Sequence, residues 1–445
     1  MTKSQRVLWL VVLSMLLSSR GMAHSEPPSL HAAHAASSYN PNELSYGLYW
    51  FGLDDASQQF VPGQANPYFD PAKPTLIFAH GWQPFLSYDL PGFAFDGVDT
   101  VAGWIDAGWN VGIFVWNQFS DETTGVSSDW FGDGPPPEGV LDAEAKVWTA
   151  NGARGMRWRD WDNYLGGGYS APPAGTPSAG ELFYDTYVAA LTDALYTGGA
   201  IRVVGHSLGN QMAVRLAKLV DESIAAGEIP AHLRPTRVAL LDPYWSPEPR
   251  DDLTGSDAAG RKTGDVVREY IAALTPGGTL FEWYWSSAWT TPPQGDANPD
   301  LKPMTLYAEM APLYATQELD KHLAAQHLYF WAYAFDGPAP CAGEACLDMT
   351  RVLSAMSDDQ LAAVLRSDYR WVQDGGQATG TPADDTYHSV LQSGAPYTVT
   401  MLTAMPVTHT VGGFVTVTAT VSAPDGALVT FATDLGTISP RSVTR

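Results

Sequence analysis

Short apolar runs alternate with longer amphipathic stretches through the middle of the chain. The apolar runs, which are rich in branched and aromatic residues, predict strands at residues 75–79, 111–116, 201–204, 237–241, 280–285 and 305–308. The amphipathic stretches predict helices at residues 98–107, 181–196, 207–226, 265–274 and 319–333. Strands that alternate with helices usually form a parallel sheet with helices on both faces. The pattern therefore predicts an α/β domain, which we place at residues 40–395.

Two long aromatic-rich insertions interrupt this pattern. Residues 117–180 contain proline and glycine clusters and predict an irregular excursion at the rim of the sheet, and residues 244–300 form the second insertion. Their aromatic side chains fit two interpretations, the lining of an acyl pocket or core residues beneath long loops. They are Trp130, Phe131, Trp148, Trp158 and Trp161 in the first insertion and Trp245, Trp283, Trp285 and Trp289 in the second.

The last part of the chain, residues 396–445, has a different pattern. Residues 414–421 read FVTVTATV, a strict alternation, and Pro424-Asp425-Gly426 separates them from a second alternating run at 428–433. This is a β-hairpin signal, and it resembles the opening strands of a bacterial immunoglobulin-like repeat of the invasin type. A complete sandwich needs about 100 residues. We therefore expect either a partial module or a short β appendage.

The N-terminus has the three-part layout of a secretory signal peptide. Lys3 and Arg6 precede an apolar run at residues 7–17, and small or polar residues follow as far as Ala23. This run is shorter than the roughly 20 residues that a transmembrane helix needs. The sequence predicts a signal peptide at residues 1–23 and a secreted, extracellular protein, with an uncleaved membrane anchor as the alternative.

The amino-acid composition limits the classes of molecule that the protein is expected to bind. The chain has 445 residues, with 48 acidic and 24 basic side chains and a formal net charge of −24. This charge argues against a nucleic-acid binder and disfavours anionic lipid head groups, because both bind through clustered Lys and Arg. Aromatic residues make up 12% of the chain, which indicates a packed globular protein.

The cysteines and acidic clusters give no strong metal signal. Cys341 and Cys346 have C-x4-C spacing, which predicts a local disulfide in an oxidising compartment, and no further zinc ligands lie nearby. Asp251, Asp252 and Asp257 have oxygen ligands that suit calcium, but they lack EF-hand spacing and fit a solvated acidic loop better. We expect no metal and no cofactor.

A candidate nucleophile follows the predicted strand at residues 201–204. The sequence Gly205-His206-Ser207-Leu208-Gly209 has the form G-x-S-x-G and leads into an amphipathic helix. Between a strand and a helix, small residues permit the sharp turn that lifts a serine hydroxyl clear of the sheet. The position predicts Ser207 as the nucleophile of an acyl-transfer reaction.

The candidate base is one of two histidines. In this architecture the order along the chain is serine, acid, histidine, and elimination leaves His322 and His327, with His388 in a polar stretch beyond the last predicted strand. Five residues apart on a helix, the two side chains point about 140° away from each other, so one of them can face Ser207. We favour His322, because it lies near the helix start, and keep His327 as the alternative.

Asp242 is the candidate acid. It follows the predicted strand at 237–241, where open α/β sheets carry functional groups, and Pro243 comes next. The next strand is followed by Ser286 and Ser287, with no acid before Asp296. Asp242 therefore has no nearby rival, although an Asp-Pro turn is an alternative role.

Two backbone amides are candidates for an oxyanion hole. One is Leu208, directly after the nucleophile, and the other is Trp82 in the segment Phe78-Ala79-His80-Gly81-Trp82. Gly81 would let the backbone approach the substrate. We expect His80 to brace this loop rather than to act as a base.

These motifs together resemble the pancreatic and lipoprotein lipase family of α/β-hydrolases. The matching pieces are the segment at 78–82, Gly205–Gly209, Leu240-Leu241-Asp242-Pro243 and Lys321-His322-Leu323, within residues 75–333. The resemblance implies an α/β-hydrolase fold with Ser207 as nucleophile, Asp242 as acid and His322 as base.

The expected function is a secreted lipase or esterase whose substrate is a small-molecule or lipid ester. The same triad serves peptides, thioesters and polyesters, so these acyl donors remain alternatives. A different alternative is a cell-surface adhesion protein with an inactive hydrolase-like domain, which the β-rich tail suggests. Besides the substrate, we expect contact with a lipid interface or a cell surface. The sequence indicates no oligomeric state.

Overall fold

The computed structural model describes residues 39–95, 97–126, 135–152, 154–164, 168–312, 314–335, 353–365, 369–375, 381–391, 399–405 and 416–421. The predicted signal peptide, Cys341 and Cys346 lie outside these residues, so both expectations stay predictions. The chain divides into two compact units, Met1–Leu391 and Gln392–Arg445, which are described separately.

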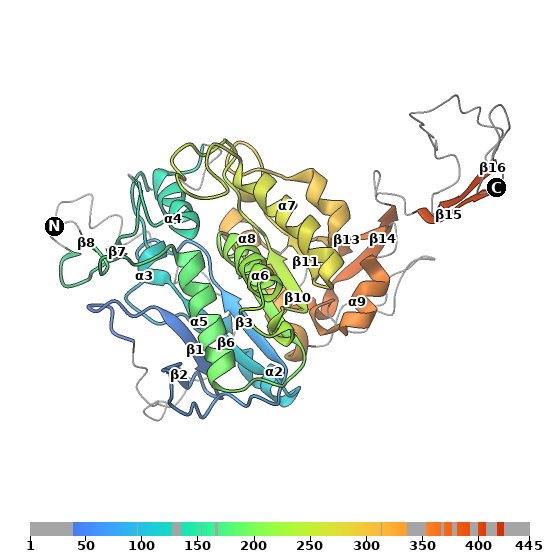
Figure 1. Cartoon of the computed structure of the whole chain (residues 1–445). Coiled ribbons are helices and arrows are strands. Elements are labelled where there is room, and N and C mark those ends of the chain that lie inside the picture. Colours follow the sequence, from blue (N-terminus) through green and yellow to red (C-terminus); the bar gives the residue numbers. More distant parts are fainter. Residues whose placement is uncertain are drawn as a thin grey trace. The chain divides into compact units, whose positions relative to one another are not determined.

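A large, mostly parallel sheet forms the centre of the first unit (Figure 1). Its strand order in the described part of the chain is β14-β13-β12-β11-β10-β9-β3-β6-β1-β2. Neighbours from β6 to β13 pair in parallel, whereas β1 is antiparallel to β6 and β2, and β14 is antiparallel to β13. The strands are β1 Gly47–Phe51, β2 Ser57–Gln59, β3 Thr75–Ala79, β6 Asn110–Val115, β9 Ile201–His206, β10 Arg237–Leu241, β11 Leu280–Trp285, β12 Leu306–Glu309, β13 Tyr369–Gly375 and β14 Thr386–Leu391.

Helices cover both faces of this sheet, and each face has its own buried apolar cluster. One cluster includes side chains of α4 Glu138–Trp148, α5 Ala179–Asp193, α6 Gly209–Ala225 and α7 Thr263–Leu274. The other includes side chains of α2 Val101–Asp106, α8 Glu318–Phe330 and α9 Asp358–Leu365. Within β3, Ile77 and Ala79 belong to the first cluster and Leu76 and Phe78 to the second, the two-residue alternation of a strand that is buried on both sides. The expected α/β-hydrolase fold is confirmed.

The segment 117–180 is more regular than predicted. It contains the short helix α3 Asn117–Ser120, the helix α4 and the small strand pair β7 Trp158–Arg159 and β8 Tyr169–Ser170. Proline clusters suggested an irregular chain, but Pro137 lies at the N-cap of α4, where a missing N–H costs no helical hydrogen bond. The predicted helix at 98–107 is also shorter, because β5 Val98–Asp99 pairs with β4 Ala94–Phe95 before α2 begins.

The sheet extends further at both edges than the sequence pattern predicted. The strands β1, β2, β13 and β14 were not anticipated, and His388 lies in β14 rather than beyond the sheet. The sequence of β13, YRWVQDG, mixes charged and aromatic residues, so it lacks the continuous apolar run of the central strands.

In the second unit, β15 Val399–Met405 pairs antiparallel with β16 Thr416–Val421. The described partner of residues 416–421 therefore precedes them in the chain. The expected pairing with residues 428–433 falls outside the described residues, and the immunoglobulin-like resemblance stays a prediction. Within the described part of the whole chain, no helix has the length and apolar character needed to cross a membrane.

Candidate active site

Ser207 lies in a sharp turn between β9 and α6. Its φ angle is +55°, a left-handed conformation that is uncommon for residues other than glycine. Such strain persists only where the surrounding structure holds it, and it concentrates at functional sites. Leu208 is the N-cap of α6, so its amide lies before the helical hydrogen-bond ladder.

Glycines make this turn possible because the backbone packs too closely for a Cβ atom. A Cβ added at Gly209 would lie 2.0 Å from the carbonyl oxygen of Ala79, and one at Gly205 would lie 2.5 Å from Cα of Asn210. One added at Gly81 would lie 2.6 Å from Cβ of Ser207 and 3.2 Å from its Oγ. The loop after β3 therefore packs directly against the serine side chain, as the G-x-S-x-G pattern and the glycine before Trp82 suggested.

Asn210 holds the turn to the neighbouring strand. Its Nδ2 donates to the carbonyl oxygens of Ser207 at 2.9 Å and Leu241 at 3.0 Å, and its Oδ1 accepts from the Leu241 amide at 3.0 Å. Asn210 was not among the residues predicted from the sequence. The available signal was an amide side chain directly after G-x-S-x-G, since an asparagine there can bond the backbone of the turn, and the structure shows that it is buried.

Asp242 lies at the end of β10 with a φ angle of +38° and no exposed surface. Its Oδ1 accepts hydrogen bonds from the backbone amides of Ser286 at 2.7 Å and Ser287 at 3.1 Å, and its Oδ2 accepts one from Ser287 Oγ. These three donors stabilise a buried carboxylate. The turn after β11 thus supplies hydrogen-bond donors for the acid instead of an acid of its own, which the sequence analysis did not foresee.

His322, in the first turns of α8, is the histidine that the structure brings to Asp242. Its Nδ1 lies 2.6 Å from Asp242 Oδ2. An ionised carboxylate only accepts hydrogen bonds, so Nδ1 carries the proton and Nε2 is left as the basic nitrogen. The ring of Trp289 lies 5.5 Å from the His322 ring, which makes Trp289 the insertion aromatic that contacts the candidate base.

His206, the residue before Ser207, contacts His322 from the other side. The two rings are 4.5 Å apart, and His206 Nε2 lies 3.0 Å from the carbonyl oxygen of His322. A carbonyl oxygen only accepts, so His206 Nε2 is the donor. Burial and the neighbouring His322 lower the pKa of His206 well below its usual value, which keeps the ring neutral. This contact ties the turn that carries Ser207 to the turn that carries His322.

His327, the alternative base, lies among aromatic rings. Its ring stacks on Phe95 at 5.6 Å and contacts Trp331 at 5.0 Å. Both histidines are buried on α8, and His322 is the one whose Nδ1 contacts Asp242. The different surroundings of the two rings agree with their spacing of five residues on a helix, which points them about 140° apart.

The loop that carries Trp82 is braced by His80. His80 Nδ1 donates to the carbonyl oxygen of Gly81 at 2.9 Å, and its Nε2 accepts from the Trp116 amide at 3.3 Å. These two contacts require a neutral ring, and burial lowers the pKa of His80 to about 4. His80 therefore occupies the bracing position expected from the sequence.

Most of the insertion aromatics belong to the core. Trp148, Trp158, Trp245 and Trp283 are buried in the cluster beneath α4 to α7, and Trp285 packs against it. Trp161 is half-buried and contacts Tyr88 and Tyr164, and Trp130 and Phe131 lie outside the described residues. The core interpretation holds for this larger group.

The described residues contain no cluster of three or more His, Cys, Asp or Glu side chains that could hold a metal ion. Of the acidic loop considered above, Asp252 pairs with Arg250 and Asp257 accepts a hydrogen bond from Tyr270. These contacts use carboxylate oxygens that a calcium ion would need.

Comparisons with known proteins add little to this geometry. No protein-family model matches the chain, and a search of curated proteins found no match. Among solved structures, the chain is similar to a thermophilic esterase from the Planctomycetes species Thermogutta terrifontis, solved with butyrate bound, at 13% sequence identity and a TM-score of 0.18. The match covers 51% of this chain and 64% of the esterase, which is less than two thirds of its length.

Proposed function

We propose that this chain is a serine hydrolase that cleaves carboxylic esters. Ser207 is the nucleophile, His322 the general base and Asp242 the acid that orients it. The observation that carries the proposal is the 2.6 Å contact between His322 and Asp242. The His322 ring also lies 4.5 Å from the ring of His206, the residue before a serine in a strained turn between a strand and a helix. This combination is the arrangement that activates an otherwise weak hydroxyl nucleophile.

In the first half of the reaction, Ser207 Oγ attacks the ester carbonyl carbon while His322 Nε2 takes the hydroxyl proton. Asp242 keeps Nδ1 protonated and stabilises the imidazolium that forms. The amides of Leu208 and Trp82 donate to the developing oxyanion. When the tetrahedral intermediate collapses, the ester C–O bond breaks, the alcohol leaves with the proton from His322, and the acyl group stays on Ser207.

In the second half, water attacks the acyl-enzyme. His322 takes a proton from the water and then returns it to Ser207 Oγ as the carboxylic acid leaves. Both halves need only the residues already named, so the proposal includes no metal or cofactor.

The proposed substrate is a lipidic ester, and the proposed location is outside the cell. The signal-peptide pattern at residues 1–23 supports export. Trp289 beside His322 supports an apolar acyl group near the reacting carbonyl, because an aromatic ring there removes apolar substrate surface from water.

The test uses nitrophenyl esters of graded chain length, a peptide substrate and a fluorophosphonate probe. We expect ester hydrolysis and labelling by the native protein, loss of both in Ser207→Ala, and retention of both in Ser256→Ala, a serine in the loop between β10 and α7 that bonds Leu253 and Ala258. Hydrolysis of the peptide alone would replace the ester assignment with a peptidase. A native protein that neither hydrolyses nor labels would favour the inactive adhesion protein.

A further inference from the structure

The loop that follows β3 is fastened to the short segment after α3. The indole Nε1 of Trp82 donates to the carbonyl oxygen of Glu122 at 2.8 Å, and the amide of Gln83 donates to that of Ser120 at 3.4 Å. Further along the loop, the Phe85 amide donates to Asp121 Oδ1 at 2.8 Å. Ser87 Oγ donates to Asp121 Oδ2 at 2.6 Å.

These contacts fix the peptide that carries the Trp82 amide from both sides. On one side, Gly81 packs against Ser207 so closely that a Cβ atom would not fit. On the other side, Gln83 and the Trp82 side chain are bonded to residues 120–122. Phe85 has a φ angle of +65°, a strained conformation that its hydrogen bond to Asp121 helps to hold.

Asp121 and Glu122 are both fully buried carboxylates, and cations surround them. Arg157 binds Glu122 through two hydrogen bonds of 2.7 and 2.6 Å, and the fully buried Lys146 pairs with the same carboxylate. Burial opposes the ionisation of Glu122, but Lys146 and Arg157 hold its pKa below the usual value. Glu122 is therefore an ionised, fixed part of the interior.

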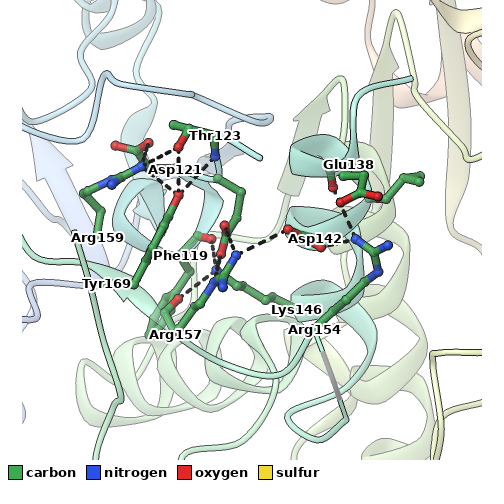
Figure 2. Close-up of polar contacts among 12 residues, drawn as sticks. Phe119, Asp121, Thr123, Glu138, Asp142, Lys146, Arg154, Arg157, Arg159 and Tyr169 are labelled. Carbon is green, nitrogen blue, oxygen red and sulfur yellow. Dashed lines mark hydrogen bonds and ion pairs between the residues drawn. The ribbon is translucent and has the colours of Figure 1, made fainter. Parts of the chain in front are cut away.

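Figure 2 shows how this group of charges is assembled. Lys146 Nζ also donates to the carbonyl oxygens of Phe119 at 2.8 Å and Arg157 at 2.7 Å, which joins α4 to both flanking segments. The ring of Tyr169 lies 4.4 Å from the guanidinium carbon of Arg157 and 4.1 Å from that of Arg159. Arg159 in turn lies 3.4 Å from Asp121 Oδ1.

A buried ion pair is weak evidence for stability, because desolvation offsets most of its attraction. A buried ion pair does fix the orientation of the carboxylate. When cations hold a carboxylate in place, its remaining lone pairs accept hydrogen bonds from fixed directions. Here the fixed oxygens of Asp121 and the fixed main chain of Glu122 face the loop that carries Trp82.

We propose that Asp121 and Glu122 position the oxyanion hole: they hold the loop at residues 82–87 so that the Trp82 amide points at the carbonyl carried by Ser207. This inference rests on the proposed esterase function. Asp121 acts through the loop and touches no reacting atom, so it is a positioning residue. The donor that it positions matters in the transition state more than in the bound substrate.

The test compares two identical chemical changes in the same charged cluster. Asp121→Asn alters the carboxylate that accepts hydrogen bonds from Phe85 and Ser87 of the loop, whereas Asp142→Asn alters a carboxylate of the same cluster that pairs with Arg154 and Arg157. Asp121→Asn keeps the size of the side chain but replaces one accepting oxygen with an NH2 group, whereas the Phe85 amide and the Ser87 hydroxyl both donate to this carboxylate. Trp82→Phe is a second variant, because it removes the indole donor and keeps an aromatic ring.

Each protein is measured for kcat and KM on the best nitrophenyl ester, with active sites titrated by the fluorophosphonate, and for its affinity for a trifluoromethyl ketone analogue of the acyl group. Misplacing such a donor costs about 10- to 100-fold. We expect kcat and ketone affinity to fall by this factor in Asp121→Asn and by about 10-fold in Trp82→Phe, with KM within about threefold of the native value. Asp142→Asn should stay within about threefold in all three quantities.

The outcomes separate the two proposals. A native protein that hydrolyses esters while Asp121→Asn keeps native kcat per titrated site would overturn the positioning role alone. An equal loss in Asp142→Asn would also overturn it, because the effect would then belong to the stability of the cluster. A native protein without ester hydrolysis or labelling would remove the proposed function and the oxyanion role together.

Discussion

Two polar networks adjoin the turn that carries Ser207, one through the contact of His322 with His206 and the other through the packing of Gly81 against Ser207, and they contain different kinds of group. On the acid side, Asp242 is held by two backbone amides, one hydroxyl and one imidazole, and each comes from the end of a strand or the start of a helix. On the oxyanion side, Asp121 and Glu122 are held by long cationic side chains from α4 and the segment after it. The first network uses backbone and side-chain donors at the carboxyl ends of the parallel strands. The second network uses buried charged side chains that lie far apart in the sequence.

This difference predicts different responses to substitution. A network of neutral donors around one carboxylate should lose catalysis when the carboxylate is changed and keep its fold. A network of buried charges should lose stability when one charge is removed and regain it when the partner is neutralised as well.

The largest effect is expected for Asp242→Asn. An amide can donate to His322 Nδ1 and so favour the wrong tautomer, which lowers kcat by about 10⁴-fold in serine enzymes with this arrangement. Thermal unfolding should change little, because the backbone amides of Ser286 and Ser287 can still donate to the amide oxygen. A measured fall in kcat of less than tenfold would mean that Asp242 does not orient the base.

Lys146→Met should have the largest effect on stability. It leaves Glu122 buried with fewer cations, and breaking a buried pair from one side typically costs about 3–5 kcal/mol. The double variant Lys146→Met/Glu122→Gln should recover much of this loss, because both buried charges are then gone. Chemical denaturation of the two variants and the native protein measures the difference, and equal stability of the single and double variants would contradict the paired arrangement.

The contrast also explains what the sequence could and could not predict. The strands at 237–241 and 280–285 were predicted with their observed bounds, because continuous apolar runs are characteristic of buried parallel strands. Asp242 and His322 were chosen from their places after a strand and at a helix start, and the structure brings these two together.

The supporting residues could not be predicted in the same way. Ser286 and Ser287 support Asp242 from 44 and 45 residues away, and Lys146 meets Glu122 across 24 residues. No local period in the sequence encodes such partners. Lys146 lies in α4, within the segment 117–180 that was expected to be irregular, so no sequence pattern placed its side chain beside Glu122. The edge strands were missed for a related reason, since half-buried strands contain polar residues and lack a continuous apolar signal.

His206 tests whether the acid side depends on its neutral donors. His206→Leu removes the hydrogen bond to the His322 carbonyl and should lower kcat by about tenfold through loss of positioning. His206→Gln places an amide donor near the position of Nε2 and should restore most of the activity. Because burial keeps His206 neutral, the acid limb of the kcat/KM profile should fall with a slope of one in the native protein. A slope of two, or equal losses in both variants, would mean that His206 has a different role.

The smallest effect is expected at the edge of the sheet, in the turn between β13 and β14. Burial and the neighbouring Asp384 raise the pKa of Asp385 to about 7, and its Oδ1 accepts a hydrogen bond from Gln373 at 2.9 Å. In the unfolded chain an aspartate titrates near about 3.9. Between these values the folded protein keeps a proton that the unfolded chain has lost, so this group's contribution to stability is full below about pH 4 and falls as the pH rises to about 7.

The Asp385→Asn side chain has no proton to lose in this range, and the stability of this variant relative to the native protein should therefore increase from pH 4 to pH 8. Asp384→Asn removes the neighbouring charge and should weaken the same trend in part. Denaturation curves at matched pH values measure both, and a difference between Asp385→Asn and the native protein that stays constant with pH would show that this edge carboxyl does not titrate as its surroundings predict.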